Sequence, residues 1–192
     1  MYHQLRICMR IKKILYLGAV LVLFNPSDGI KVFAADSSSP SQPVHQSAVK
    51  EIPLHECTDD RMAVKFLCNP DWKLETKENT LFIIIEETPS VTLTIARSDS
   101  PVIFLKQLTK PVLQEMGQYE KDFQTQDVKL NNSDALMVSG YSKDHPDLRL
   151  LDYYLIHDVQ LYSILFAVAP KERWDDYEEL IKKIVGSIEF LK

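Results

Sequence analysis

The chain has 192 residues, of which 45% are hydrophobic, enough apolar material for the core of one ordinary domain. Residues 1–35 hold five of the 22 basic residues and one of the 27 acidic residues, so the remainder has a formal charge of −9. Nucleic-acid binding requires basic patches that neutralise phosphates, and an acidic domain without a basic cluster argues against that function. The same charge disfavours adhesion to anionic membranes.

The beginning of the chain has the pattern of a secretory signal peptide. A basic stretch at residues 9–13 precedes an apolar run of 11 residues at residues 14–24, which is shorter than the span of about 20 residues that crosses a membrane. Ala34 then offers a small residue for signal peptidase. We predict a signal peptide at residues 1–34 and an exported protein, periplasmic or extracellular. The alternative is an uncleaved segment that provides the only membrane contact.

A polar linker is expected to separate this signal from the domain. Residues 35–50 are rich in serine and contain two prolines but no aromatic residue, which predicts disorder. Residues 51–192 are then expected to form one domain.

Strands and turns are predicted in the first part of the domain. Residues 62–67 read as a strand, and residues 69–71 as a turn. The unbroken apolar run at residues 81–85 predicts a strand covered on both faces. A turn at residues 88–90 leads to a strand at residues 91–96, in which apolar and smaller or polar residues alternate, as on a strand with one apolar face.

A helix is predicted after this strand. Apolar residues recur at helical spacing from residue 104 to residue 116, and Ser100 followed by Pro101 has the pattern of a helix cap. Pro111 lies inside the pattern, so a kink or break is expected near Thr109.

The second part of the domain predicts an antiparallel meander and a final helix. Residues 123–130, 135–142, 149–156 and 161–168 read as strands, and their short connections favour hairpins. After them, apolar residues recur every three or four positions from Trp174 onward, which predicts a helix with one buried stripe. The order of strands, helix, strands and helix predicts an α+β fold in which helices cover an antiparallel β-sheet.

This layout resembles the PsbP-like fold family, which includes PsbP and the DcrB-like exported proteins. The resemblance rests on the opening strand and the Asn69–Trp72 turn, on the strand at residues 161–168, and on the last helix with its ending at residues 186–190. It covers residues 54–192 and implies an αβα sandwich without catalytic residues. Members of the family act as accessory, assembly or binding proteins.

Two cysteines lie outside the predicted signal peptide, Cys57 and Cys68. An oxidising compartment permits a disulfide between them. Closing so short a loop would stabilise the fold by about 2.5–3 kcal/mol. The alternative is two free cysteines, with Cys68 buried at the end of a strand.

The densest group of potential metal ligands surrounds the first cysteine. His55, Glu56, Asp59 and Asp60 offer an imidazole and three carboxylates, which bind Zn²⁺ or Mn²⁺. Their spacing matches no closed structural zinc site, so the alternative is a polar segment at the start of the domain. No other cofactor is expected.

A second polar group lies in a predicted hairpin loop. Asp144, His145 and Asp147 form a candidate binding loop, because loops carry function more often than cores do. The alternative is an ordinary solvated turn.

The sequence has no nucleophile elbow, zinc-protease motif or nucleotide-binding loop, so we do not expect an enzyme. We predict a non-enzymatic accessory or binding protein of the cell envelope that acts through an envelope protein partner. The first alternative is a periplasmic protein that binds a small ligand or a divalent metal. The second is an enzyme in which His145 or His157 meets another titratable group.

Overall fold

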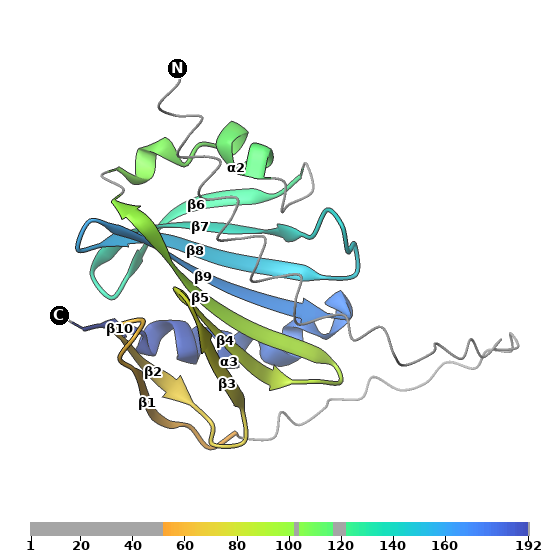
Figure 1. Ribbon diagram of the computed structural model, residues 1–192. Helices are drawn as coiled ribbons and strands as arrows, with labels where there is room; N and C mark the ends of the chain where they lie inside the picture. Colours follow the sequence, from red (N-terminus) through yellow and green to blue (C-terminus); the bar gives the residue numbers. More distant parts are fainter. Residues whose placement is uncertain (1–51, 102–103, 117–121, 192) are drawn as a thin grey trace, which may run out of the picture.

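The structure is a computed structural model that describes residues 52–101, 104–116 and 122–191 (Figure 1). The predicted signal peptide and linker lie outside the described residues. Within those three ranges, no helix combines the length and the apolar character that a membrane crossing needs.

The described residues form two antiparallel sheets, two α-helices and two short 3₁₀ helices. The strands of the large sheet are β3 (Lys73–Lys77), β4 (Thr80–Glu86), β5 (Ser90–Pro101), β6 (Gln124–Leu130), β7 (Ser133–Tyr141), β8 (Arg149–His157) and β9 (Gln160–Ala169). The strands of the small sheet are β1 (His55–Asp59), β2 (Val64–Cys68) and β10 (Glu189–Phe190). The helices are η1 (Leu105–Gln107), α2 (Lys110–Met116), η2 (Lys171–Arg173) and α3 (Trp174–Ser187).

The large sheet has the strand order β3-β4-β5-β9-β8-β7-β6, and the small sheet has the order β1-β2-β10. The predicted meander is confirmed, because β6, β7, β8 and β9 pair in succession as antiparallel neighbours. Two of its turns use consecutive residues with positive φ, Asn131 with Asn132 and Asp158 with Val159. Such turns match the right-handed twist of paired strands and fix the register of the hairpins.

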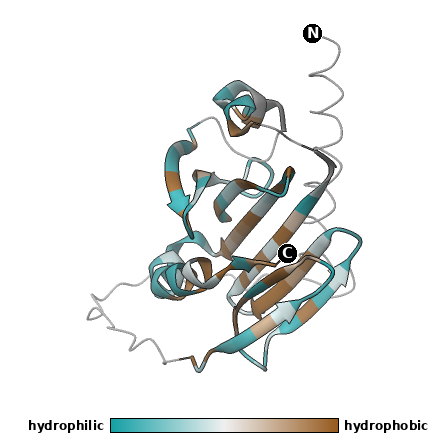
Figure 2. Ribbon diagram, turned by 90° about the vertical axis from the view of Figure 1, so that its left-hand side faces the viewer, coloured by the Kyte–Doolittle hydropathy of each residue, from teal (hydrophilic) through white to brown (hydrophobic). Residues whose placement is uncertain are grey.

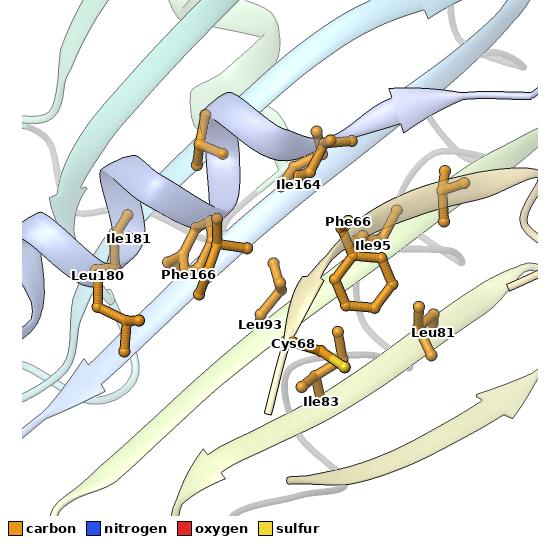
Figure 3. Close-up of a cluster of buried hydrophobic side chains, with 14 of the residues drawn as sticks. Phe66, Cys68, Leu81, Ile83, Leu93, Ile95, Ile164, Phe166, Leu180 and Ile181 are labelled. Carbon is orange, nitrogen blue, oxygen red and sulfur yellow. The ribbon is translucent and has the colours of Figure 1, made fainter. Parts of the chain in front are cut away.

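The main core lies between one face of the large sheet and α3 (Figure 3). Leu93 and Ile95 of β5 are 0% exposed and lie opposite Phe166 and Ile164 of β9 in the ladder. Each side chain of this size contributes about 1.5–3 kcal/mol when it is buried. The predicted stripe of α3 is confirmed, and its buried residues are Trp174, Tyr177, Leu180, Ile181, Ile184 and Val185. The outward side of the helix is hydrophilic (Figure 2).

A second core lies on the opposite face of the large sheet. Leu150 of β8 and Leu165 of β9 pack there with Leu108, with Leu113 of α2 and with Phe123. This cluster draws on β7, β8 and β9, so it covers the part of the sheet that is far from β3.

The helical coverage of the sheet differs from the expectation. The α+β class and the antiparallel sheet are confirmed, but α3 shares its face of the large sheet with the strands of the small sheet. On the other face, the described helical residues are only those of η1 and α2. Helices therefore cover only part of each face, and the expected αβα sandwich with a sheet covered by helices is not supported by the described residues. β1, β3 and β10 were not predicted, because their polar sequences have no alternating apolar pattern.

Of two local expectations for the first helix, one was wrong and one is confirmed. β5 continues to Pro101, so Ser100 is not a helix cap. The expected break near Thr109 is confirmed, because α2 begins at Lys110 and holds Pro111 in its first turn. Proline fits there because the first helical N–H groups have no partner within the helix.

The apolar run at residues 81–85 forms most of β4, but it is not covered on both faces. Leu81 and Ile83 are 1% exposed and belong to the main core. Phe82 and Ile84 point to the opposite face, remain partly exposed and belong to neither core cluster. β4 therefore carries more apolar surface than the described fold buries.

Candidate functional site

The β1–β2 hairpin brings His55, Cys57 and Cys68 together. Residues two apart on a strand share a face, so His55 and Cys57 point the same way, and the register places Cys68 directly opposite His55. The Nε2 atom of His55 lies 3.4 Å from the Sγ atom of Cys57 and 3.4 Å from that of Cys68. We call these three residues the hairpin cluster.

The structure joins Cys57 and Cys68 in a disulfide, which supports the predicted pairing. Their Cα atoms are 5.9 Å apart, within the usual range for a bridged pair. Cys68 is 2% exposed and lies among core side chains of β4 and β5 (Figure 3), whereas Cys57 is partly buried. The bridge therefore closes the hairpin and ties its outer strand to the strand that faces the core.

The hairpin cluster is reachable from solvent at one end. His55 is exposed and lies on β1, which is an edge strand of the small sheet. Next to it, the side-chain amide of Asn69 donates a hydrogen bond of 2.7 Å to the carbonyl of Pro53. This bond joins the two chain segments that flank the hairpin, so the backbone on both sides of the cluster is held in place.

The acidic residues predicted as metal ligands are not part of this cluster. Glu56 points to the other face of β1 and forms an ion pair of 2.7 Å with Lys65. The hydrogen bond from Lys65 to Glu56 raises the pKa of Lys65. Asp59 accepts a 2.8 Å hydrogen bond from the N–H of Met62 and another from the Thr76 hydroxyl.

The predicted set of His55, Glu56, Asp59 and Asp60 is therefore not assembled around one point. Strand alternation separates Glu56 from His55, and the hairpin turn uses Asp59 as a capping acceptor. From the sequence alone, Cys57 and Cys68 were expected to form a disulfide or to be free thiols. The cross-strand register of β1 and β2 is the signal that would have placed Cys68 beside His55.

The second predicted group, Asp144, His145 and Asp147, forms the β7–β8 turn. Asp144 and Asp147 are exposed. Backbone hydrogen bonds hold the loop, and in one of them the N–H of Leu148 donates to the carbonyl of His145 at 2.8 Å. The N–H of Lys171 also bonds to the carbonyl of Asp147 at 2.8 Å. The loop thus docks against η2, and the described contacts do not bring its side chains together as a ligand set.

His145 precedes β8 and His157 ends it, so the two histidines lie at opposite ends of this strand. His157 stacks on the ring of Phe190 with centroids 5.1 Å apart, and its Nε2 atom is 3.5 Å from the exposed carboxylate of Asp158. These contacts fit a side chain that packs the end of the sheet.

A second candidate is the outer face of β4 and β5. Phe82 lies opposite Thr94, Ile84 lies opposite Thr92, and Thr92 lies opposite Ala167 of β9. All five side chains are partly exposed. We call them the β4–β5 strip. Its signal in the sequence was the apolar run at residues 81–85, which holds more apolar residues than a strand with one buried face needs.

Charged residues flank the strip on the neighbouring edge strand. Lys73 lies opposite Ile84, Glu75 lies opposite Phe82, and both charged residues are exposed. Lys73 also pairs with Glu87, and this hydrogen bond lowers the pKa of Glu87. An apolar centre with a charged rim is the usual anatomy of a protein-binding surface.

No family model and no curated protein matches the sequence. Among solved structures, the cyanobacterial PsbP (CyanoP) of Synechocystis is 15% identical with a TM-score of 0.50, over 75% of this chain and 96% of that one. A variant of the protein Mog1 is 12% identical with a TM-score of 0.50, over 73% and 97%. The Ran-binding protein Mog1p of Saccharomyces cerevisiae is 11% identical with a TM-score of 0.49, over 74% and 97%.

At these identities the likeness concerns the fold alone, and for CyanoP and the Mog1 variant it spans nearly the whole of the matched protein. It agrees with the resemblance that the strand and helix order indicated. The chain therefore has the PsbP-like fold.

Proposed function

We propose that the chain is an exported, non-enzymatic binding protein of the cell envelope that engages a protein partner through the β4–β5 strip. The observation that carries this proposal is the partial exposure of Phe82 and Ile84, which lie side by side on one face of β4 and outside both cores. A partner that covers the exposed part of these side chains removes apolar surface from water, which contributes about 25 cal/mol per Å² to binding.

Four further features support this function. The signal-like segment at the beginning of the chain and the Cys57–Cys68 disulfide are both typical of an exported protein. The residues outside the predicted signal carry a formal charge of −9, which suits a partner with a basic surface. The PsbP-like fold is associated with binding and accessory roles, which is an argument from the fold and not from a site.

The test is affinity capture from the envelope of the native cell with a variant that lacks the apolar strip. Phe82→Thr with Ile84→Thr removes the apolar surface and keeps side chains that favour strands. The matched control is Val159→Asn, which removes an apolar side chain that is 61% exposed in the β8–β9 turn.

The proposal predicts one reproducible partner that the wild type and Val159→Asn both retain and the double variant loses by about tenfold or more. Equal thermal stability of the three proteins excludes misfolding as the cause. Equal capture by all three proteins, or capture of no reproducible partner by the wild type, would contradict the proposed function.

A further inference from the structure

We propose that the hairpin cluster is a redox-gated metal site, which binds Zn²⁺ through His55, Cys57 and Cys68 when the disulfide is reduced. The three ligand atoms of this cluster lie within 4.8 Å of one another and come from two adjacent strands. The site lies in the small sheet, and the proposal is independent of the β4–β5 strip and of its partner.

The distances fit one tetrahedral ion. With Zn–S bonds of about 2.3 Å and Zn–N bonds of about 2.0–2.1 Å, neighbouring sulfur and nitrogen ligands lie about 3.6 Å apart. The Nε2 atom of His55 is 3.4 Å from each sulfur, close to this value. The two sulfurs must separate from bonded distance to about 3.8 Å, which small rotations about the Cα–Cβ bonds supply.

The donor set selects the class of metal. Two thiolates and an imidazole are soft and borderline ligands, which favour Zn²⁺ over Mn²⁺, Mg²⁺ or Ca²⁺. Three protein ligands leave the fourth position open, and the exposed His55 lies on the side that solvent reaches. The site therefore accepts water or a ligand from another molecule in the fourth position, as sites that exchange their metal require.

The oxidation state decides whether the metal binds. A dithiol reductant breaks the Cys57–Cys68 bond: two electrons and two protons pass to the protein sulfurs, and the reductant leaves as a disulfide. Zn²⁺ then replaces the two thiol protons, which go to solvent, and the neutral His55 binds through Nε2. In the oxidised protein the sulfurs are bonded to each other and are not available as thiolates.

The experiment uses Co²⁺ as a spectroscopic substitute for Zn²⁺. The protein is reduced with a phosphine, desalted under nitrogen and titrated with Co²⁺, and an oxidised sample is titrated in parallel. We expect one equivalent of Co²⁺ to give a thiolate-to-cobalt charge-transfer band and the visible bands of a four-coordinate site, and Zn²⁺ to displace it. The oxidised sample should show neither band.

Variants separate the cluster from other ligands. Cys57→Ser should abolish the charge-transfer titration at stoichiometric Co²⁺, and His55→Ala should weaken binding by about tenfold or more. Two controls should match the wild type: His157→Ala, which removes a histidine in the large sheet, and Glu56→Gln, which removes an acid on the other face of β1.

Circular dichroism and thermal melting of the same samples show whether each protein is folded and whether the metal stabilises it. Zn²⁺ should raise the melting temperature of the reduced wild type and leave that of the oxidised protein unchanged. Three results would overturn the proposal: no four-coordinate spectrum in the reduced protein, equal affinity of His55→Ala and wild type, or a reduced protein that unfolds and is not restored by the metal.

Discussion

Removing the Cys57–Cys68 disulfide should lower the free energy of unfolding by about 2.8 kcal/mol. The two cysteines are separated by 11 residues, and the chain-entropy relation for a loop of that length gives this value at 25 °C. Cys57→Ser is the most conservative change, because Cys57 is only partly buried and the buried Cys68 is left in place as a small apolar side chain.

Urea unfolding measured by circular dichroism tests this prediction. Oxidised wild type, reduced wild type and Cys57→Ser are compared in a buffer that contains a chelator, so that no metal replaces the bridge. Reduced wild type and the variant should coincide, about 2.8 kcal/mol below the oxidised protein. The reductant should have no effect on Cys57→Ser.

A change of less than about 0.5 kcal/mol in the stability of the wild type on reduction would contradict this prediction. Such a result would mean that the bridge does not restrict the unfolded chain, either because it does not form or because the hairpin stays ordered after unfolding.

Three further predictions concern α3 and its contacts. Gly186→Ala should stabilise the protein by about 0.5–1 kcal/mol in thermal unfolding, because nothing lies within 4 Å of the added Cβ atom and glycine disfavours the helix. Ser187→Ala should cost about 1–3 kcal/mol in the same assay, because it leaves the N–H of Leu67 without the 2.8 Å bond to the serine oxygen, and Ser187→Thr should lose less. Burial and a hydrogen bond to Glu86 raise the pKa of Tyr177 above its ordinary 10.0, so the stability contributed by the protonated Tyr177 should be intact below that pH and lost as the pH rises above it. Urea unfolding at about pH 9 and about pH 11 should show a smaller loss for Tyr177→Phe than for wild type, and equal losses would contradict the assignment.

Patterns with a clear period were sufficient to predict most of the large sheet. Leu93 and Ile95 alternate with smaller residues and face the core, and the short connections of the meander are hairpins. The final helix was predicted from one apolar stripe, which docks as expected. In these elements the local pattern and the tertiary packing require the same conformation, so the sequence alone was informative.

Strands without a periodic pattern of apolar residues were not predicted, and the reason is physical. β1 and β3 consist largely of polar residues, and their strand conformation comes from pairing with β2 and β4 rather than from their own burial. β10 has two residues and forms because α3 ends beside β2. Tertiary neighbours determine such segments, and a single sequence does not contain that information.

The candidate sites were likewise predicted only where a local sequence pattern was sufficient, and missed where strand pairing determined them. The acids near Cys57 were adjacent in sequence, but the alternation of strand faces separates Glu56 from His55. The hairpin cluster depends on the register that places Cys68 opposite His55, which composition and spacing did not provide. The β4–β5 strip was visible as surplus apolar residues, but their exposure required knowledge of which face the cores cover.

Photocrosslinking in the native cell tests the central claim, that the chain is an exported binding protein whose partner covers the β4–β5 strip. A photoreactive phenylalanine analogue replaces Phe82, and the matched control carries it at the exposed Lys183 of α3. We predict one discrete adduct with an envelope protein at position 82, lost when Ile84→Thr is added, and none at position 183. Equal adducts at both positions, or an adduct at position 82 only with cytoplasmic proteins, would contradict it.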